Sequence, residues 1–162
     1  MGKSDDKTNV CRVLDQKKVS YKTHVCPDAE GLSGDEIAAV LNENPEQAFK
    51  TLVTVGKTGK NYVFVVPVNK ELDLKKAAKS VGVKSVAMIH VADINKVTGY
   101  IRGGCSPVGM KKQFATVFDE SCLAQPTILV SGGRIGTQIE CAPADLVKVT
   151  RGKTAAITAE NA

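Results

Sequence analysis

The first part of the chain changes from helical to strand spacing of its apolar residues. Val10, Val13 and Leu14 recur at positions i, i+3 and i+4, which predicts a helix near residues 8–18. Apolar and polar residues then alternate from Tyr21 to Val25, as expected for a short strand. A helix followed by a strand is therefore predicted to open the domain.

Two further helices are marked by the residues that precede them. Ser33-Gly34-Asp35-Glu36 has the form of a capping box and comes before the apolar residues Ile37 and Val40, which predicts a second helix. Asp73 is suited to cap a third helix, and Gly82 is suited to end it.

Runs of β-branched and apolar residues predict the strands. Residues 49–55 and 62–68 flank the turn Gly56-Lys57-Thr58-Gly59, which predicts a β-hairpin. The other predicted elements are a short helix at 93–97, strands at 116–118, 127–131 and 137–142, and a last helix from Pro143 to Val149.

These elements mix helices with hairpins and do not form a regular βαβ alternation. The prediction is an α/β (mixed α+β) fold, with a mixed, largely antiparallel sheet or half-barrel and flanking helices. A chain of 162 residues suits one core, so residues 8–150 are expected to form a single domain. The small, polar ends, residues 1–7 and 151–162, are expected to be loose.

Composition narrows the class of protein. Aromatic residues make up only 4% of the chain, so an aliphatic core is expected, and a net charge of +5 permits a polyanionic partner without requiring one. Five cysteines without a CxxC pair and only two histidines argue against a disulfide framework or a metal site. Free thiols, a charged N-terminus and the lack of a long apolar run favour the cytoplasm.

Lys50 is the first candidate site residue. It interrupts the apolar run from Phe49 to Val53, where an unpaired ammonium group is costly to bury. Its side chain either lies on a solvated face or points into a cleft, where it would orient a carbonyl group or stabilise developing negative charge. Strand spacing alone favours the solvated position.

Two glycine-containing segments are candidates for substrate-contacting loops. Paired glycines at Gly103 and Gly104 open the segment that ends at Gly109, and they would let the backbone approach a ligand closely. The segment from Val130 to Gly136 carries Ser131 near its start. Neither segment matches a known phosphate-binding fingerprint, and simple turns account for both equally well or better.

A nucleophile supplied by the protein has little support in the sequence. Cys105, Ser106 and Ser131 are potential nucleophiles, and His24 and His90 are the only histidines. The chain has no GxSxG elbow, and both histidines lie in strand-like segments where a structural role is the commoner one.

Basic residues form two groups along the chain. Five lysines fall between Lys70 and Lys84, and Arg102, Lys111 and Lys112 lie beside the glycine-containing segment. Such groups bind phosphates with an affinity that depends on salt, although a solvated face is their usual role. Few aromatic residues are available to stack on bases.

Five motifs occur along the chain in a fixed order: Phe49-Lys50-Thr51-Leu52-Val53, Leu72-Asp73-Leu74-Lys75-Lys76-Ala77-Ala78-Lys79, Thr98-Gly99-Tyr100, Gly103-Gly104-Cys105-Ser106-Pro107-Val108-Gly109-Met110-Lys111-Lys112 and Val130-Ser131-Gly132-Gly133. In this order they resemble the bacterial Cys-tRNA(Pro) deacylase family over roughly residues 8–150. The order of several motifs is far more specific than any one of them.

This resemblance implies a trans-editing enzyme that removes cysteine from mischarged Cys-tRNA(Pro), and from Cys-tRNA(Cys) too. A second sieve is needed because binding alone discriminates poorly between amino acids of similar size. The resemblance also implies a mixed α/β fold, no metal or other cofactor, and a mechanism in which the thiol of the bound cysteine attacks its own ester.

The resemblance also implies roles for individual residues and partners. Lys50 would be the catalytic residue, orienting the aminoacyl group and offsetting negative charge, and Thr51, Gly103, Gly104 and Ser131 would shape the substrate pocket. The partners would be the acceptor end of aminoacyl-tRNA, contacted through its backbone, and prolyl-tRNA synthetase, with neither DNA nor a membrane involved.

The chain departs from the family pattern at two places. Many relatives carry an aromatic residue at or near the position of Cys26, and they usually read Lys-Arg-Gly where this chain has Arg134-Ile135-Gly136. The second departure removes one cation next to Ser131.

Two other functions are left open. An Ala-tRNA(Pro) deacylase of the same superfamily would need an activated water, because alanine has no thiol. A non-catalytic module that binds tRNA or a synthetase would bind without turnover. A thiol redox protein that uses Cys26 or Cys105 is disfavoured by the spacing of these two residues.

Overall fold

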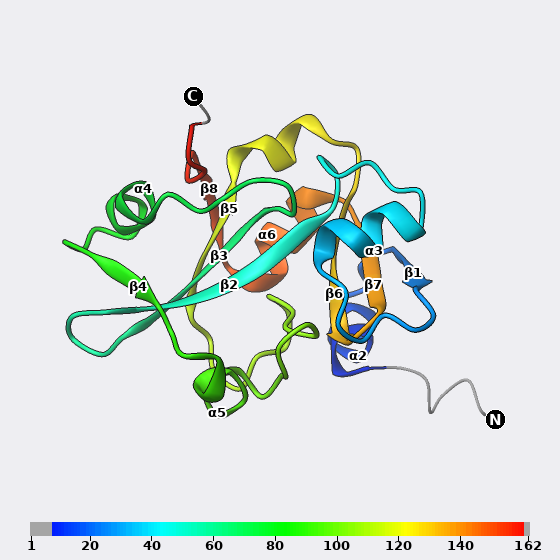
Figure 1. The fold of residues 1–162 in the computed structure, drawn as a ribbon, viewed down its shortest axis with the longest axis horizontal. Helices are drawn as coiled ribbons and strands as arrows, with labels where there is room; N and C mark the ends of the chain where they lie inside the picture. Colours follow the sequence, from blue (N-terminus) through cyan, green and yellow to red (C-terminus); the bar gives the residue numbers. More distant parts are fainter. Residues whose placement is uncertain (1–7, 161–162) are drawn as a thin grey trace.

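The computed structural model describes residues 8–160, which fold around two sheets (Figure 1). The larger sheet has the strand order β4-β2-β3-β5-β8 and the smaller one β1-β7-β6. The strands are β1 (Tyr21–Val25), β2 (Phe49–Gly56), β3 (Asn61–Pro67), β4 (Val86–Met88), β5 (Ala115–Asp119), β6 (Ile128–Arg134), β7 (Thr137–Cys141) and β8 (Lys153–Ala155). The helices are α2 (Asn9–Gln16), α3 (Gly34–Val40), α4 (Leu74–Ser80), α5 (Ile94–Thr98) and α6 (Pro143–Thr150), with 3-10 turns η1 (Val91–Asp93) and η2 (Glu120–Ala124).

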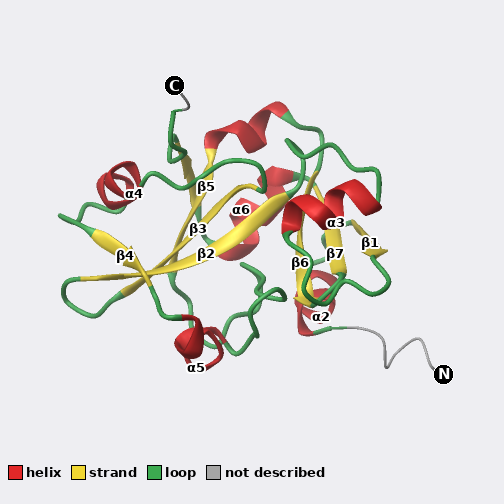
Figure 2. Cartoon of the chain, in the orientation of Figure 1, coloured by secondary structure: helices red, strands yellow, loops and turns green. Residues whose placement is uncertain are grey.

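Most strand pairs are antiparallel, as the sequence predicts. The β2–β3 hairpin begins with Phe49 opposite Pro67, and β6 and β7 form a second hairpin. The exceptions are the parallel pairs β3–β5 and β5–β8. The mixed α/β class with flanking helices is therefore confirmed, and Figure 2 shows the helices arranged around the strands.

The central strand β3 separates two hydrophobic cores. Val63 and Val65 belong to the core that also contains α2 and α6, whereas Phe64 and Val66 belong to the core beneath α4. All four side chains are fully buried, because successive residues of a strand point to opposite faces. This explains why the sequence of β3 reads as a continuous apolar run and does not alternate.

The predicted helix caps are confirmed. The Ser33 hydroxyl accepts from the Glu36 N–H at 3.1 Å, and the Glu36 carboxylate accepts from the Ser33 N–H at 2.8 Å. Asp73 accepts from the N–H groups of Lys75 and Lys76 at 2.9 and 3.0 Å. These caps stabilise the first turns of α3 and α4 by supplying acceptors for otherwise unpaired donors.

The C-terminal segment differs from its prediction. Instead of forming a loose tail, it adds β8 to the sheet and buries Ile157 completely. The Ile157 N–H also donates to the Asp119 carboxylate at 3.0 Å. Parallel pairing with a distant strand has no local sequence signal, which is why β8 was not predicted. The predicted loose residues 1–7 lie outside the described part of the chain, as do residues 161–162.

The short strand β4 was not predicted either. It pairs antiparallel with the end of β2, where Val55 lies opposite Ala87. Only Val86 of its three residues is buried, so its sequence does not show the alternation of a half-buried strand.

Candidate active site

A cavity of about 800 Å³ lies between the two sheets, α3 and the loop that follows α5. Four of the five predicted site residues line it: Lys50, Thr51, Gly103 and Ser131. The fifth, Gly104, is buried behind this lining. A volume of this size is typical of small-molecule and cofactor sites.

The contact between the two sheets brings Lys50 and Ser131 together. Ala48, just before β2, forms a parallel bridge with Leu129 of β6, and the Leu129 N–H donates to the Gln47 carbonyl at 2.9 Å. Because the bridge is parallel, Lys50 and Ser131, each two residues beyond it, lie side by side on the two strands. Residues 81 positions apart in sequence thus reach one wall of the cavity.

The Lys50 side chain is partly buried. It is 30% exposed, and its Nζ lies 3.7 Å from an oxygen of Glu71, whose side chain is 83% exposed. The fully solvated position favoured by strand spacing is therefore not observed. An exposed partner at this distance interacts weakly, so the ammonium group is available to a ligand in the cavity.

Two buried oxygen atoms next to the cavity have no hydrogen-bond partner among the described residues. They are Thr51 Oγ1 and Gln138 Oε1, and both residues line the cavity. The Gln138 amide is held from its other end, where Nε2 donates to Glu43 at 3.1 Å. Burial raises the pKa of Glu43. Unpaired buried acceptors are costly, so these atoms are suited to a donor that a ligand would bring.

The glycine-containing loop packs directly on the β6–β7 turn. Gly103 has φ +88°, and the Ile135 side chain lies over it. A Cβ added to Gly104 would meet the backbone of Arg134 and Ile135 at 3.1 Å. Gly104 is thus explained by this close approach of two backbones, and direct contact of Gly104 with a substrate stays a prediction.

Buried contacts hold the same loop in place. The Tyr100 hydroxyl donates to the Val108 carbonyl, and burial raises the pKa of Tyr100 to about 12. Asn9 of α2 donates to the Gly109 carbonyl at 3.1 Å, and the Lys111 N–H donates to the Thr98 carbonyl at 3.0 Å. The loop is therefore a fixed part of the cavity wall.

Among the candidate nucleophiles, Cys105 is the one that brings a thiol to the cavity lining. Burial raises the pKa of this thiol to about 11, so it is neutral near pH 7 and a poor nucleophile. Ser106 is buried and its hydroxyl accepts from the Val108 N–H at 3.3 Å. Neither residue has the environment of an activated nucleophile.

The two histidines lie outside the cavity lining. His24 Nε2 is 2.7 Å from Oε1 of Glu140, and Oε2 of the same carboxylate accepts from the Thr127 hydroxyl at 2.6 Å. These hydrogen bonds lower the pKa of Glu140. His24 therefore has the structural role expected for it, and His90 is exposed ahead of η1.

The two departures from the family pattern have different consequences. Cys26 is buried outside the cavity lining, and its N–H donates to the Gly136 carbonyl at 2.7 Å. Ile135 is part of the lining, where it replaces a cation with an apolar contact to Gly103. Only the second departure changes the surface that a ligand would meet.

Sequence reasoning did not assign several lining residues to the site. Arg102, which it placed in a basic group beside the glycine-containing segment, adds a second cation, and Met88 and Val91 are 46% and 54% exposed. Gln138 lies opposite Ser131 in the β6–β7 pair. The sequence predicts both strands, so pairing them in the correct register would have placed Gln138 beside Ser131. Within residues 8–160, no cluster of three or more His, Cys, Asp or Glu could hold a metal ion, and no helix is long and apolar enough to cross a membrane.

Comparison with known proteins gives matches over most of the chain. The family described as the aminoacyl-tRNA editing domain matches residues 28–149. A protein of Enterococcus faecalis (strain ATCC 700802 / V583), EbsC, whose name describes it as a Cys-tRNA(Pro)/Cys-tRNA(Cys) deacylase, is 47% identical over 96% of each chain.

Solved structures share the fold. A structure described as a trans-editing enzyme for prolyl-tRNA synthetase superposes with a TM-score of 0.81 at 24% identity, covering 94% of this chain and 96% of the other. The hypothetical protein APE2540 gives a TM-score of 0.86 at 24% identity, covering 94% and 100%. At this identity the two structures support the fold alone.

Proposed function

This chain belongs to the aminoacyl-tRNA editing domain family, and on that premise we propose that it is a trans-editing deacylase that removes cysteine from mischarged Cys-tRNA(Pro). The observation that carries the proposal is the position of Lys50. Its ammonium group lines a cavity together with Thr51, Gly103 and Ser131, and its ion-pair partner within residues 8–160 is the largely exposed carboxylate of Glu71.

The nucleophile is the thiol of the substrate. Its sulfur attacks the carbonyl carbon of the same cysteinyl group, and a cyclic thiolactone forms as the ester bond to the terminal ribose breaks. The electron pair leaves with the ribose oxygen, which takes up a proton, so intact tRNA is released. No protein nucleophile is consumed, and both reacting groups belong to one molecule, which removes the entropy cost of bringing them together.

The properties of the cavity support this assignment. Cys105 is neutral because of its raised pKa, and neither histidine lines the cavity to act as its base. Alternatives that use a protein thiol, including a redox function, therefore lose support. An alanyl substrate would require an activated water and a base, and the described lining offers no histidine for that role.

Lys50 acts by charge. A cation beside the reacting group lowers the pKa of the substrate thiol and stabilises the negative charge that develops on the carbonyl oxygen. Thr51 Oγ1 and Gln138 Oε1 accept hydrogen bonds from the substrate α-ammonium group, which satisfies two acceptors that are otherwise unpaired. The ester carbonyl is thereby held near Lys50.

The finer points of the proposal concern partners. The protein acts in the cytoplasm on the acceptor end of aminoacyl-tRNA, and prolyl-tRNA synthetase delivers the mischarged tRNA. The family and the net charge of +5, which suits a polyanionic partner, support these points.

The test is deacylation of Cys-tRNA(Pro), Ala-tRNA(Pro), Pro-tRNA(Pro) and Cys-tRNA(Cys) by the purified protein. We expect rapid loss of the cysteinyl esters, which blocking of the substrate thiol should prevent, and stable alanyl and prolyl esters. Loss of the alanyl ester would replace the thiol mechanism with a water-based one. Binding without turnover, with prolyl-tRNA synthetase present or absent, would leave a non-catalytic module.

A further inference from the structure

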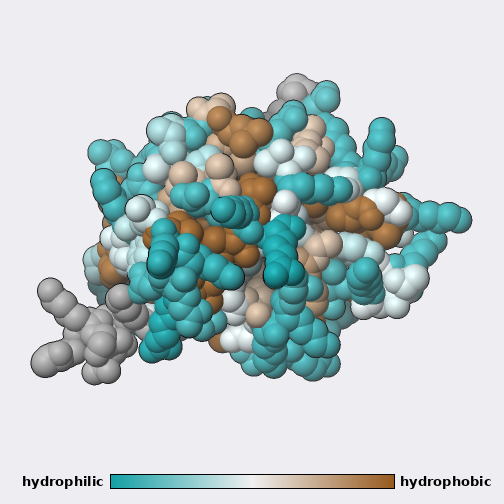
Figure 3. Space-filling model, turned by 180° about the vertical axis from the view of Figure 1, so that it is seen from behind, coloured by the Kyte–Doolittle hydropathy of each residue, from teal (hydrophilic) through white to brown (hydrophobic). Residues whose placement is uncertain are grey.

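A second pocket of about 260 Å³ lies between the C-terminal ends of α2 and α6 and the second half of the loop that follows α5. Its lining shares no residue with the candidate active site, but both linings draw on that one loop. Arg102, Gly103 and Cys105 face the active-site cavity, and residues 107–113 face this pocket. Figure 3 shows the opposite side of the molecule from Figure 1, with polar residues surrounding smaller apolar patches.

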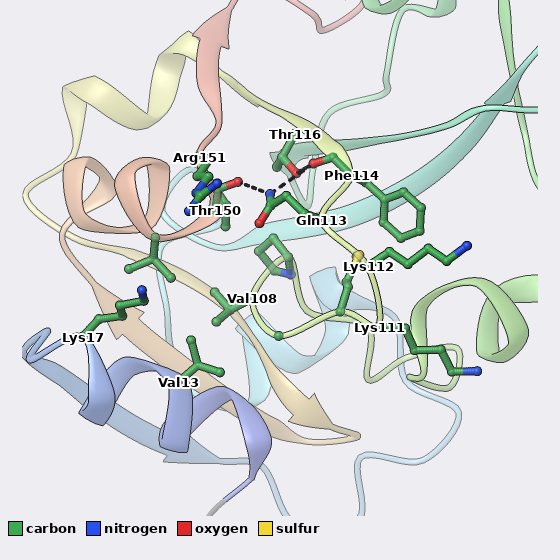
Figure 4. A pocket seen from close by; sticks show the side chains of 14 residues that line it. Val13, Lys17, Val108, Lys111, Lys112, Gln113, Phe114, Thr116, Thr150 and Arg151 are labelled. Atoms are coloured by element: carbon green, nitrogen blue, oxygen red, sulfur yellow. Dashed lines mark hydrogen bonds between the residues drawn. The ribbon is translucent and has the colours of Figure 1, made fainter.

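The exposed part of the pocket lining is cationic. Its five exposed residues are Lys17, Lys111, Lys112, Gln113 and Arg151, and no carboxylate belongs to the lining. Figure 4 shows Lys17 and Arg151 on the side of the pocket next to Val13 and Val108, and the side chains of Lys111 and Lys112 extending away from Val108 on the other side. Cations gathered in this way give the pocket and its rim a positive potential that attracts an anion.

Three of these cations have no partner of their own. Within residues 8–160, Lys17, Lys112 and Arg151 form no ion pair, whereas Lys111 Nζ donates to the Lys96 carbonyl at 3.3 Å. The pocket is also rigidly built, because the Gln113 amide donates to the Thr150 carbonyl at 2.6 Å and so ties the loop to α6.

The backbone at Arg151 points to a role for its side chain. Arg151 caps the C-terminus of α6 in the left-handed region, with φ 55° and ψ 35°. Glycine is the preferred residue in this conformation, because a side chain is strained there. Local backbone preference therefore does not account for an arginine at this position.

We propose that this pocket binds phosphate groups of the tRNA backbone while the 3′ end occupies the active-site cavity. Lys17 would contact a phosphate as a point charge, and Arg151 would contact one as a forked donor. Such contacts position the RNA without reading its sequence. The inference rests on the proposed function for its ligand, but its binding test does not require cleavage.

The experiment measures equilibrium binding of uncharged tRNA(Pro) between 50 and 200 mM KCl by fluorescence anisotropy. In the Lys17→Gln/Arg151→Gln variant we expect binding to weaken about tenfold. The slope of log K against log [salt], which is negative, should become shallower by roughly 1.5, the value for two lost phosphate contacts. The matched control is Lys57→Gln/Lys60→Gln, which removes two exposed cations from the β2–β3 turn. An unchanged slope, or the same loss in the control, overturns the proposal.

Two further arms separate the alternatives. Arg151→Gly is expected to keep or raise the Tm while weakening tRNA binding, whereas a purely structural arginine would leave binding unchanged. A cysteinyl ester of adenosine should be cleaved equally by the double variant and the parent, because it carries no phosphate that the pocket could bind. Inorganic phosphate that saturates the pocket without competing with tRNA would identify a small-anion site and overturn the RNA assignment.

Discussion

Replacing Lys50 with methionine tests the charge on which the proposed mechanism depends. Methionine keeps an unbranched apolar side chain against the cavity wall and removes the ammonium group. A unit negative charge about 4 Å from that group interacts with it by about 4 kcal/mol at an effective dielectric constant near 20. This energy corresponds to about 10³ in rate.

Solvent reduces this figure, because the Lys50 side chain is 30% exposed. We therefore expect Lys50→Met to lower kcat/KM for Cys-tRNA(Pro) by about 10²- to 10³-fold, the range found when one donor to a developing oxyanion is removed. The assay is loss of the cysteinyl ester under subsaturating conditions, with Tm as a check that the variant is folded.

Two controls separate the charge from other effects. Glu71→Gln removes the carboxylate 3.7 Å from Lys50, and because Glu71 is 83% exposed we expect less than about a threefold change. The pH profile should also move: if Lys50 favours the substrate thiolate, the rise in rate shifts to higher pH in Lys50→Met. A Lys50→Met enzyme within threefold of the parent at every pH would refute the role of the ammonium charge.

Other predictions concern the thiol, the loop and the pH dependence of stability. Cys105→Ala should leave deacylation within about twofold, because a thiol with a pKa of about 11 is not the nucleophile; complete loss in a folded protein would restore a protein thiol to the mechanism. Gly104→Ala should lower activity on Cys-tRNA(Pro) by at least about tenfold, because a Cβ at 3.1 Å from the Arg134 backbone separates the two loops; wild-type kinetics would show that the loops yield. Glu140→Gln should lower the Tm at pH 7. The difference should shrink as the pH falls below about 4.3, since a carboxyl with a depressed folded-state pKa stabilises the fold only while it is ionised; a difference that does not depend on pH would mean that its hydrogen bond to His24 is not charge-assisted.

Local chemistry determined much of this fold. The capping residues Ser33 and Asp73 act on N–H groups two or three positions away, and the turn after β2 joins neighbours in sequence. Such interactions depend on a few adjacent residues, so their sequence patterns predicted α3, α4 and the β2–β3 hairpin. The ordered motifs likewise pointed to Lys50, Thr51, Gly103 and Ser131, which meet at one cavity.

Only the tertiary structure decided how the distant segments meet. The parallel strand β8 and the burial of Ile157 depend on pairing with β5, which the small residues of the C-terminus do not indicate. Whether Lys50 faced solvent or a cavity depended on the bridge between Ala48 and Leu129. The basic pocket likewise forms where the loop after α5 meets the end of α6, a contact that includes the hydrogen bond from Gln113 to Thr150. Sequence periodicity fixes which residues share a face of one element, but the neighbour that covers that face is selected by packing across the whole chain.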